Sequence, residues 1–341
     1  MHMANELLSI PVATGTLAIA AAGLGFLCRK VRRAIAADKL ALMGILGAFV
    51  FAGQMVNFQL PAMPGTSGHM IGAVLLAIIL GPHLGAIVIS SVVIIQCLIF
   101  QDGGLLALGC NIINMALVPS YLGYYVYRIV TAGRFSSVRA YIGAMIASVL
   151  AVQAGAILVP IQAALSGVLV VPLSTFLITM IGIHFLVGFV EGLMTVAVLA
   201  YLQQLRPDLV ADSLPGKVRL SRKAVLATLA VFAVIIAAGL SLLASDLPDG
   251  LEWSYAERPD QPDFKSSVSN QDSRISEVDD FQSKYSPLPD YSLRASKVGA
   301  VAEQEADVGA GWTSFAGVVG SLLTMTAIWL TAWILRKKQS P

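Results

Sequence analysis

The first two residues of the chain carry the atoms of a metal chelate. A free amino terminus followed by histidine offers three nitrogens in sequence: the α-amine of Met1, the amide nitrogen of His2 and the imidazole Nδ1 of His2. A divalent metal that displaces the amide proton closes two fused chelate rings through these atoms. One more imidazole would complete four nitrogens in a plane, which is the geometry associated with Ni(II) or Cu(II).

His69 is the candidate for the fourth nitrogen. Residues 60–70 contain two prolines and two glycines, so we expect an irregular loop, and the charge pattern described below places it outside the cell. We therefore predict a metal site made by Met1, His2 and His69. Four nitrogens in a plane favour Ni²⁺, but low-spin cobalt accepts the same arrangement. Both ions stay open as the ligand, and copper fits by coordination chemistry as well.

Two further polar residues share one face of a later apolar stretch. His184 and Glu191 are seven residues apart, which is about two helical turns. Ionisable groups inside membrane segments are costly and are therefore candidates for function. One interpretation is an interhelical hydrogen-bond pair, and the other is coupling to a partner subunit.

Uncharged polar residues also interrupt apolar stretches at Gln96, Asn111 and Asn114. Asn111 and Asn114 are three residues apart, so both could face the helix bundle. They could hold helices together, or they could order the groups around a metal. His83 follows Pro82 at an expected turn, where an ordinary solvated histidine is predicted.

The elements that position these residues are membrane helices. Of the 341 residues, 57% are hydrophobic and 12% are charged, whereas soluble proteins carry about a quarter charged residues. This composition disfavours a soluble enzyme, a disordered regulator and a nucleic-acid-binding protein, and the net charge of +2 indicates no polyanionic partner. We predict an all-α polytopic protein of the lipid bilayer, with about seven helices in a first bundle and two in an accessory module.

Apolar stretches that could cross the membrane occur nine times. A single crossing needs about 20 residues, and one stretch, 70–81, is shorter. It is either a half-buried segment or a crossing completed by its neighbours, and we count it as a crossing. The predicted segments are 9–28, 40–59, 70–81, 83–101, 105–127, 140–165, 174–203, 224–245 and 313–335.

The basic residues predict the orientation. Lys and Arg cluster near 29–39, 128–139, 206–223 and 336–338, and short cytoplasmic loops are rich in these residues. Nine crossings place all four clusters on the inner side of the cell membrane, with the amino terminus outside and the carboxyl terminus in the cytoplasm. No cation precedes the first apolar stretch, so a cleaved signal peptide is not expected.

Composition also divides the chain into parts. Residues 1–205 form the predicted metal-binding bundle, with small residues at Gly15, Gly44, Gly47, Gly53 and Gly143 that suit close helix packing. A basic linker over 206–223 leads to an accessory module at 224–341. Within this module, the external segment 246–312 holds fourteen of the twenty acidic residues. We expect this segment to admit cations, since carboxylates are poor donors for a selective nickel site.

Several motifs resemble one membrane transport family. In chain order they are Met1-His2-Met3, Pro64-Gly-Thr-Ser-Gly-His69-Met-Ile-Gly72 before Gly81-Pro82, residues 96–111, and His184-Phe-Leu-Val-Gly-Phe-Val-Glu191-Gly192. Together they resemble the substrate-binding component of cobalt/nickel energy-coupling-factor transporters, the CbiM/NikM family. Members of this family usually have an acidic residue and glycine near position five, where this chain has Asn5-Glu6.

The second part resembles the companion subunit that is often fused behind this component. Its signature, Pro248-Asp249-Gly250-Leu251-Glu252, opens the external segment directly after a membrane helix. The resemblance as a whole implies a fused subunit of NikMN type.

This resemblance implies a non-catalytic transport subunit that captures Ni²⁺ or Co²⁺. No Gly-x-x-x-x-Gly-Lys-[Ser/Thr] phosphate loop occurs in the chain. The resemblance implies that energy comes from ATP-binding cassette ATPase subunits through a transmembrane coupling subunit. A membrane enzyme would require a cluster such as His-Glu-x-x-His, which is absent. The alternative that stays open is a structural or assembly protein of the membrane without metal transport.

Overall fold

The structure, a computed structural model, describes residues 1–31, 37–132, 136–210, 217–256, 265–292 and 311–337. Within these ranges the named regular elements are helices apart from one short hairpin, β1 (Phe58–Gln59) with β2 (Ser67–Gly68). The predicted all-α architecture is therefore confirmed. Parts of the basic clusters and of the external segment lie outside the described residues.

The first part of the chain, up to Leu209, forms the larger group of helices. Its elements are η1 (Asn5–Leu7), α1 (Ile10–Val31), α2 (Ala37–Gln54), α3 (Ala73–Leu80), α4 (Pro82–Phe100), α5 (Leu108–Asn111), the π-helical η2 (Ile112–Leu117), α6 (Val118–Thr131), α7 (Ser137–Leu165), α8 (Leu173–Leu205) and η3 (Pro207–Leu209).

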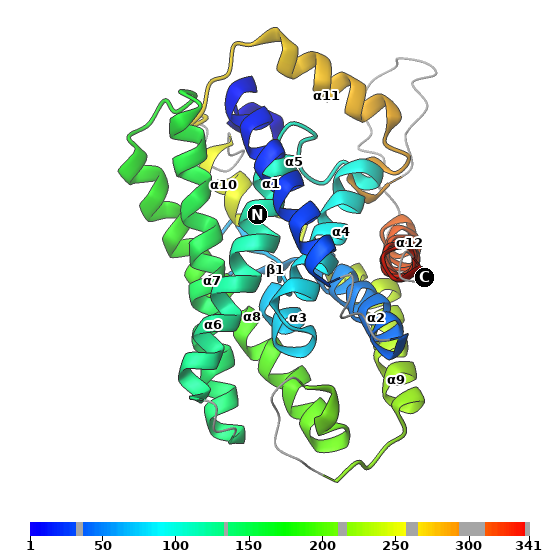
Figure 1. Cartoon of the computed structure of the whole chain (residues 1–341). Helices are drawn as coiled ribbons and strands as arrows, with labels where there is room; N and C mark the ends of the chain where they lie inside the picture. Colours follow the sequence, from blue (N-terminus) through cyan, green and yellow to red (C-terminus); the bar gives the residue numbers. More distant parts are fainter. Residues whose placement is uncertain (32–36, 133–135, 211–216, 257–264, 293–310, 338–341) are drawn as a thin grey trace.

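The second part contains two long helices and a connection between them. Its elements are α9 (Arg222–Ala238), η4 (Leu240–Leu243), α10 (Gly250–Tyr255), α11 (Ser273–Tyr285), η5 (Pro289–Tyr291) and α12 (Gly311–Lys337). In Figure 1, α11 crosses one end of the molecule, and the amino terminus lies in the middle, surrounded by helices.

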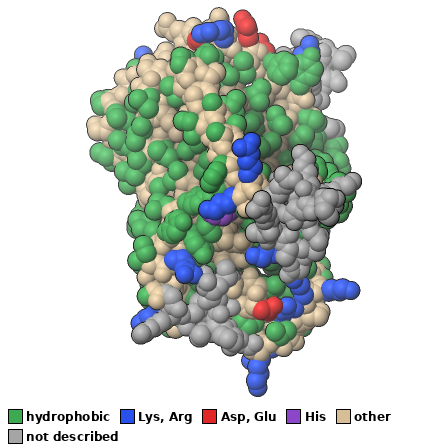
Figure 2. All heavy atoms as spheres, in the orientation of Figure 1, with side chains coloured by type: hydrophobic (Ala, Val, Ile, Leu, Met, Phe, Trp, Pro, Cys, Tyr) green, Lys and Arg blue, Asp and Glu red, His purple; other side chains and the backbone are tan. Residues whose placement is uncertain are grey.

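Six helices of the described chain are long and apolar enough to cross a membrane. They correspond to α1, α4, α7, α8, α9 with η4, and α12, and a shorter apolar helix lies at Lys39–Gln54 in α2. Hydrophobic side chains cover much of the face shown in Figure 2. Several large ones on α7, α8 and α12 are exposed, among them Leu165, Ile178 and Ile334. The chain is thus a multi-pass membrane protein.

The short stretch 70–81 does not cross as a helix of its own. Here α3 has eight residues, all of them buried, and a helix of this size is about 12 Å long, less than half of the hydrocarbon thickness. The irregular loop before it must supply the rest of any crossing, which bilayers tolerate only where protein surrounds the backbone. The short buried helix agrees with the shortness of this stretch in the sequence, and its crossing of the membrane together with its neighbours stays a prediction.

The stretch 105–127 also differs from a regular span. After α4, Gln101 and Gly103 take positive φ angles of 58° and 88°, so the chain turns through an irregular segment before helix resumes at Leu108. The helical path then continues to Thr131 through the π-helical turn η2. Asn111 and Asn114 are both fully buried, as their spacing predicted.

The accessory helices pack on α2, because α9 and α12 both contact it and also contact each other. A Cβ atom added at Gly47 would lie 2.2 Å from Ile328 Cδ1, and one at Gly44 would lie 3.3 Å from the Met325 carbonyl oxygen. These predicted packing glycines therefore allow the close approach of α12. Gly15 was predicted with them but meets no atom within 4 Å, so its prediction is wrong.

Candidate metal centre

The first residues of the chain are inserted into the bundle. Met1 and Met3 are 4% and 0% exposed, although a charged amino terminus would ordinarily stay in water. Both backbone groups of Met3 are held by one side chain: its N–H donates to Asn111 Oδ1 at 2.7 Å, and its carbonyl accepts from Asn111 Nδ2 at 3.2 Å. Asn111 thus orders the amino-terminal segment, which is the second of the two roles considered for it.

The next turn of the chain is fixed by Asn5, the residue that departs from the family pattern. Its Oδ1 accepts from the Leu106 N–H at 2.7 Å, and its Nδ2 donates to Asp279 of α11 at 2.5 Å. A Cβ at Gly104 would lie 2.5 Å from the Asn5 nitrogen, so the glycine permits this contact. The departure therefore links the terminus to the accessory segment.

His69 is positioned by the hairpin before it and by a carboxylate after it. The hairpin pairs Phe58 with Gly68 and Gln59 with Ser67. After His69, the N–H groups of Ile71 and Gly72 donate to Glu191 at 2.5 and 2.8 Å. His69 Nδ1 lies 3.0 Å from the carbonyl oxygen of Met70, which leaves Nε2 free to face the amino terminus.

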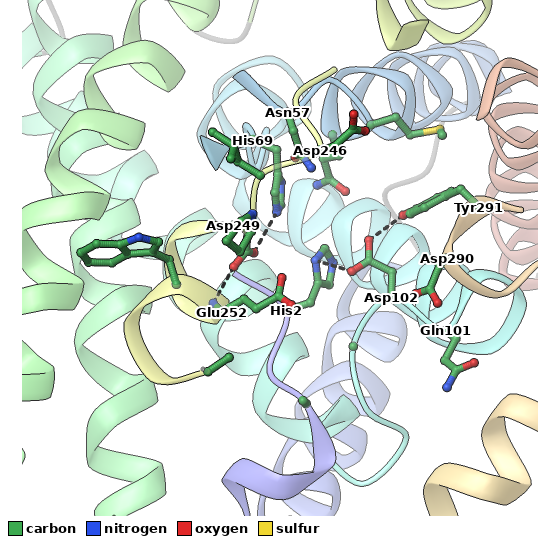
Figure 3. A pocket seen from close by; sticks show the side chains of 18 of the residues that line it. His2, Asn57, His69, Gln101, Asp102, Asp246, Asp249, Glu252, Asp290 and Tyr291 are labelled. Atoms are coloured by element: carbon green, nitrogen blue, oxygen red, sulfur yellow. Dashed lines mark hydrogen bonds and ion pairs between the residues drawn. The ribbon is translucent and has the colours of Figure 1, made fainter. Parts of the chain in front are cut away.

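These supports bring the three predicted residues together, as Figure 3 shows for the two histidines. The Met1 amine nitrogen lies 3.1 Å from His69 Nε2. The rings of His2 and His69 are stacked, with centroids 5.4 Å apart and an interplanar angle of 19°. Among the described residues no group of three or more His, Cys, Asp or Glu side chains could hold a metal.

Both ring nitrogens of His2 face side-chain oxygens. Its Nδ1 lies 3.0 Å from Asp102 Oδ1, and its Nε2 lies 3.1 Å from Gln96 Oε1. A neutral imidazole has one N–H, so it can donate to only one of these two oxygens. Turning Nδ1 toward the amine would therefore cost one hydrogen bond, not two.

Burial makes both imidazoles suitable donors. It lowers the pKa of His2 below its ordinary value. Burial, together with the nearby Met1 ammonium, lowers the pKa of His69 to about 3. Metal ligands must be deprotonated, and both rings meet this condition at neutral pH.

Asp249 is the site residue that the sequence analysis missed. Its Oδ2 accepts a hydrogen bond from the Met1 ammonium at 2.5 Å and lies 3.8 Å from His69 Nε2. Although burial opposes the charged form, the Met1 ammonium and His69 hold the pKa of this carboxyl well below its usual range. The signal was available, since Asp249 is the second residue of the Pro-Asp-Gly-Leu-Glu string.

A cavity of about 810 Å³ opens beside the two histidines. Both parts of the chain line it, and its carboxylates include Asp102, Asp246, Asp249, Glu252 and Asp290. Burial and the nearby Asp102 raise the pKa of Asp290, and burial together with Asp249 does the same for Glu252. Crowded carboxylates of this kind would be relieved by a cation.

The other predicted polar residues have different outcomes. His184 and Glu191 do not pair, because His184 Nδ1 bonds the Met180 carbonyl at 2.9 Å while Glu191 holds the loop after His69. Asn114 forms the expected interhelical contact, a reciprocal amide pair with Gln162. His83 is not simply solvated, since its Nδ1 lies 2.6 Å from the Tyr121 hydroxyl.

The fold and the inserted terminus define a polytopic membrane protein with a buried nitrogen cluster. Residues 2–209 match the CbiM family, the cobalt uptake substrate-specific transmembrane region, and residues 223–337 match the PDGLE domain. The chain therefore belongs to the CbiM family and carries a PDGLE domain behind it.

Relatives with related names occur in archaea and bacteria. A putative fused nickel transport protein NikMN of Archaeoglobus fulgidus is 36% identical over 223 residues, which are 65% of this chain and 72% of the relative. The cobalt transport protein CbiM of Geobacter sulfurreducens is 25% identical over 76% of this chain and 77% of its own. A crystal structure of a truncated transition metal transporter has a TM-score of 0.53 at 30% identity and covers 60% of this chain and 99% of its own.

Proposed function

We propose that the protein is the substrate-specific component of an ATP-driven energy-coupling-factor importer for Ni²⁺ or Co²⁺. The ion binds to the α-amine of Met1, the amide nitrogen and imidazole of His2, and the imidazole of His69. The observation that carries this proposal is the 3.1 Å separation of the Met1 amine and His69 Nε2 inside the bundle.

This separation suits two donors of one metal. Nitrogens in neighbouring corners of a square, each about 2 Å from the ion, lie about 2.9 Å apart. In the proposed plane His69 neighbours the amine and lies opposite the His2 amide nitrogen. The amide nitrogen is anionic once it has lost its proton, which offsets part of the metal's charge within an apolar bundle.

The names of the relatives agree with this ion class. Nickel is named for the fused NikMN relative and cobalt for the CbiM relative. The acidic cavity would gather hydrated cations before capture. The partners would be a transmembrane coupling subunit and ATP-binding cassette ATPases, which supply the energy for release inside. We propose the division 1–205, 206–223 and 224–341 for the metal-binding bundle, the basic linker and the accessory module.

The test uses purified full-length protein whose terminal residue is confirmed by mass spectrometry. Nickel content, affinity and absorption spectrum are measured for the wild type, His2→Ala, His69→Ala and a chain extended by one alanine before Met1. Each change should abolish high-affinity binding or change the spectrum, because Met1 is buried and an extended terminus cannot keep its amine beside His69.

His83→Ala is the matched control, since this histidine contacts Tyr121 and not the site, and it should bind nickel as the wild type does. An extended chain with the affinity and spectrum of the wild type would rule out ligation by Met1. A wild type that binds neither nickel nor cobalt would favour the structural alternative.

A further inference from the structure

The PDGLE segment runs directly beside the strand that leads to His69. Ser67 donates its N–H to the Pro248 carbonyl at 2.9 Å and its hydroxyl to the Leu247 carbonyl at 2.7 Å. Ser67 and Asp249 form a parallel β-bridge, which adds the accessory segment to the edge of the β1–β2 hairpin. The segment is therefore fixed two residues before a proposed metal ligand.

The two carboxylate oxygens of Asp249 accept hydrogen bonds from different groups. Oδ1 accepts the N–H groups of Leu251 and Glu252, both at 2.8 Å, and so caps the start of α10. Oδ2 accepts from the Met1 ammonium. Because Oδ1 is fixed by the helix cap, the direction of Oδ2 is fixed as well.

The next two residues of the motif hold α10 against α8. A Cβ at Gly250 would lie 2.2 Å from Ile183 Cγ2, so only glycine allows this approach. Leu251 is 1% exposed. Helix α10, which Asp249 caps, thus packs directly against the bundle formed by the first part of the chain.

We propose that Asp249 is a positioning residue of the metal site, by which the accessory module completes a site whose ligands all belong to the first part of the chain. This inference rests on the proposed function. Asp249 keeps the Met1 amine beside His69 before the ion arrives, through a charge-assisted hydrogen bond. A coordinated amine keeps N–H groups, so the carboxylate can still orient it after binding, as outer partners orient ligands in other metal sites.

The competing explanation is that Asp249 acts only as a helix cap. Asn and Ser cap helices about as well as Asp does, so Asp249→Asn and Asp249→Ser preserve the cap while they remove the ion pair with Met1. Glu277→Gln is the matched control. It removes a carboxylate from the same accessory module, at an exposed position on α11 that does not line the cavity.

The first measurement needs no metal. The purified full chain in detergent is treated near neutral pH with a small amine-reactive reagent, and the labelled N-terminal peptide is followed by mass spectrometry. The wild-type amine should react slowly, because it is buried and paired with Asp249. Asp249→Asn and Asp249→Ser should be labelled several-fold faster, and Glu277→Gln should behave as the wild type does.

The second measurement is nickel titration of the same variants. An apparent dissociation constant rises as the inverse of the competent fraction, so a terminus in place about a tenth of the time weakens binding about tenfold. The Asp249 variants should show this loss with an unchanged nickel absorption spectrum, since the ligands remain the same.

Labelling of Asp249→Asn at the wild-type rate, or a nickel affinity of Asp249→Asn equal to that of Glu277→Gln, would overturn the inference. A wild type without nickel binding would reject the proposed function instead, and the labelling rates would still decide whether Asp249 holds the terminus.

Discussion

At the scale of single residues, the proposed metal donors are held in place by neighbouring polar side chains. Asn111 fixes Met3, and Glu191 fixes the backbone after His69. The chemistry of a Met-His terminus led to the prediction of a site at Met1, His2 and His69, and the structure brings the Met1 amine within 3.1 Å of His69 Nε2; that they bind a metal stays a prediction. The role of Glu191 was not predictable, because its partners are backbone N–H groups 119 and 120 residues away, and backbone donors leave no signal in residue type.

Glu191→Gln tests this support at the residue scale. A glutamine side chain offers one carbonyl oxygen, so one of the two backbone N–H groups would lose its acceptor and face an NH₂ group instead. Leaving such a group unsatisfied costs about 1–3 kcal/mol. We expect a lower unfolding temperature in detergent and weaker nickel binding, because the loop that carries His69 loosens.

Thr195→Val is the matched control on the same helix. Thr195 is buried one turn from Glu191, and its hydroxyl has no hydrogen-bond partner among the described residues. This variant should keep the wild-type unfolding temperature and nickel affinity. A Glu191→Gln protein as stable and as tight-binding as Thr195→Val would show that the carboxylate is not what holds His69.

At the scale of elements, helix α2 joins the two parts of the molecule. The composition predicted packing glycines on it, and Gly44 and Gly47 do face α12. The glycines of α12 that allow close packing were not predicted. A glycine pattern indicates that another helix packs closely, but it does not show which helix that is. The structure supplies Gly317 and Gly320, where an added Cβ would lie 2.7 Å from the Ala237 carbonyl and 2.1 Å from Phe51 Cζ.

Gly320→Leu should therefore separate the accessory helices from the bundle. The new side chain would overlap the rings of Phe51 and Phe100, and neither ring is free to leave a packed position. With a protease site placed in the linker 206–223, the two wild-type fragments should co-purify after cleavage, whereas the Gly320→Leu fragments should separate. Gly311→Leu on the same helix meets no atom within 4 Å and should co-purify, and separation of both variants alike would contradict the packing argument.

At the scale of the whole molecule, the site is shared by both parts of the chain. The sequence alone predicted the helical bundle, since membrane segments are read from composition. It could not predict that the amino terminus and the PDGLE string meet, because 248 residues separate Met1 from Asp249 and no local pattern links them. It also could not predict that only eight residues of the stretch 70–81 are helical, because an apolar run does not reveal where a helix begins and ends.

The distribution of charges along the chain predicts its orientation in the membrane. Sixteen of the 22 Lys and Arg residues lie outside the segment 246–312, whose own formal charge is 6 − 14 = −8. Basic loops stay in the cytoplasm, so the acidic segment and the cavity that it lines should face outward.

Single cysteines at Ser269, which is exposed, and at Ser340 are placed in a chain without Cys28, Cys97 and Cys110. An impermeant thiol reagent should label intact cells at position 269 but not at 340, whereas opened cells should be labelled at both. Protection of position 269, or labelling of position 340 in intact cells, would contradict the predicted orientation. The acidic cavity would then face the cytoplasm, where it could not collect ions for import.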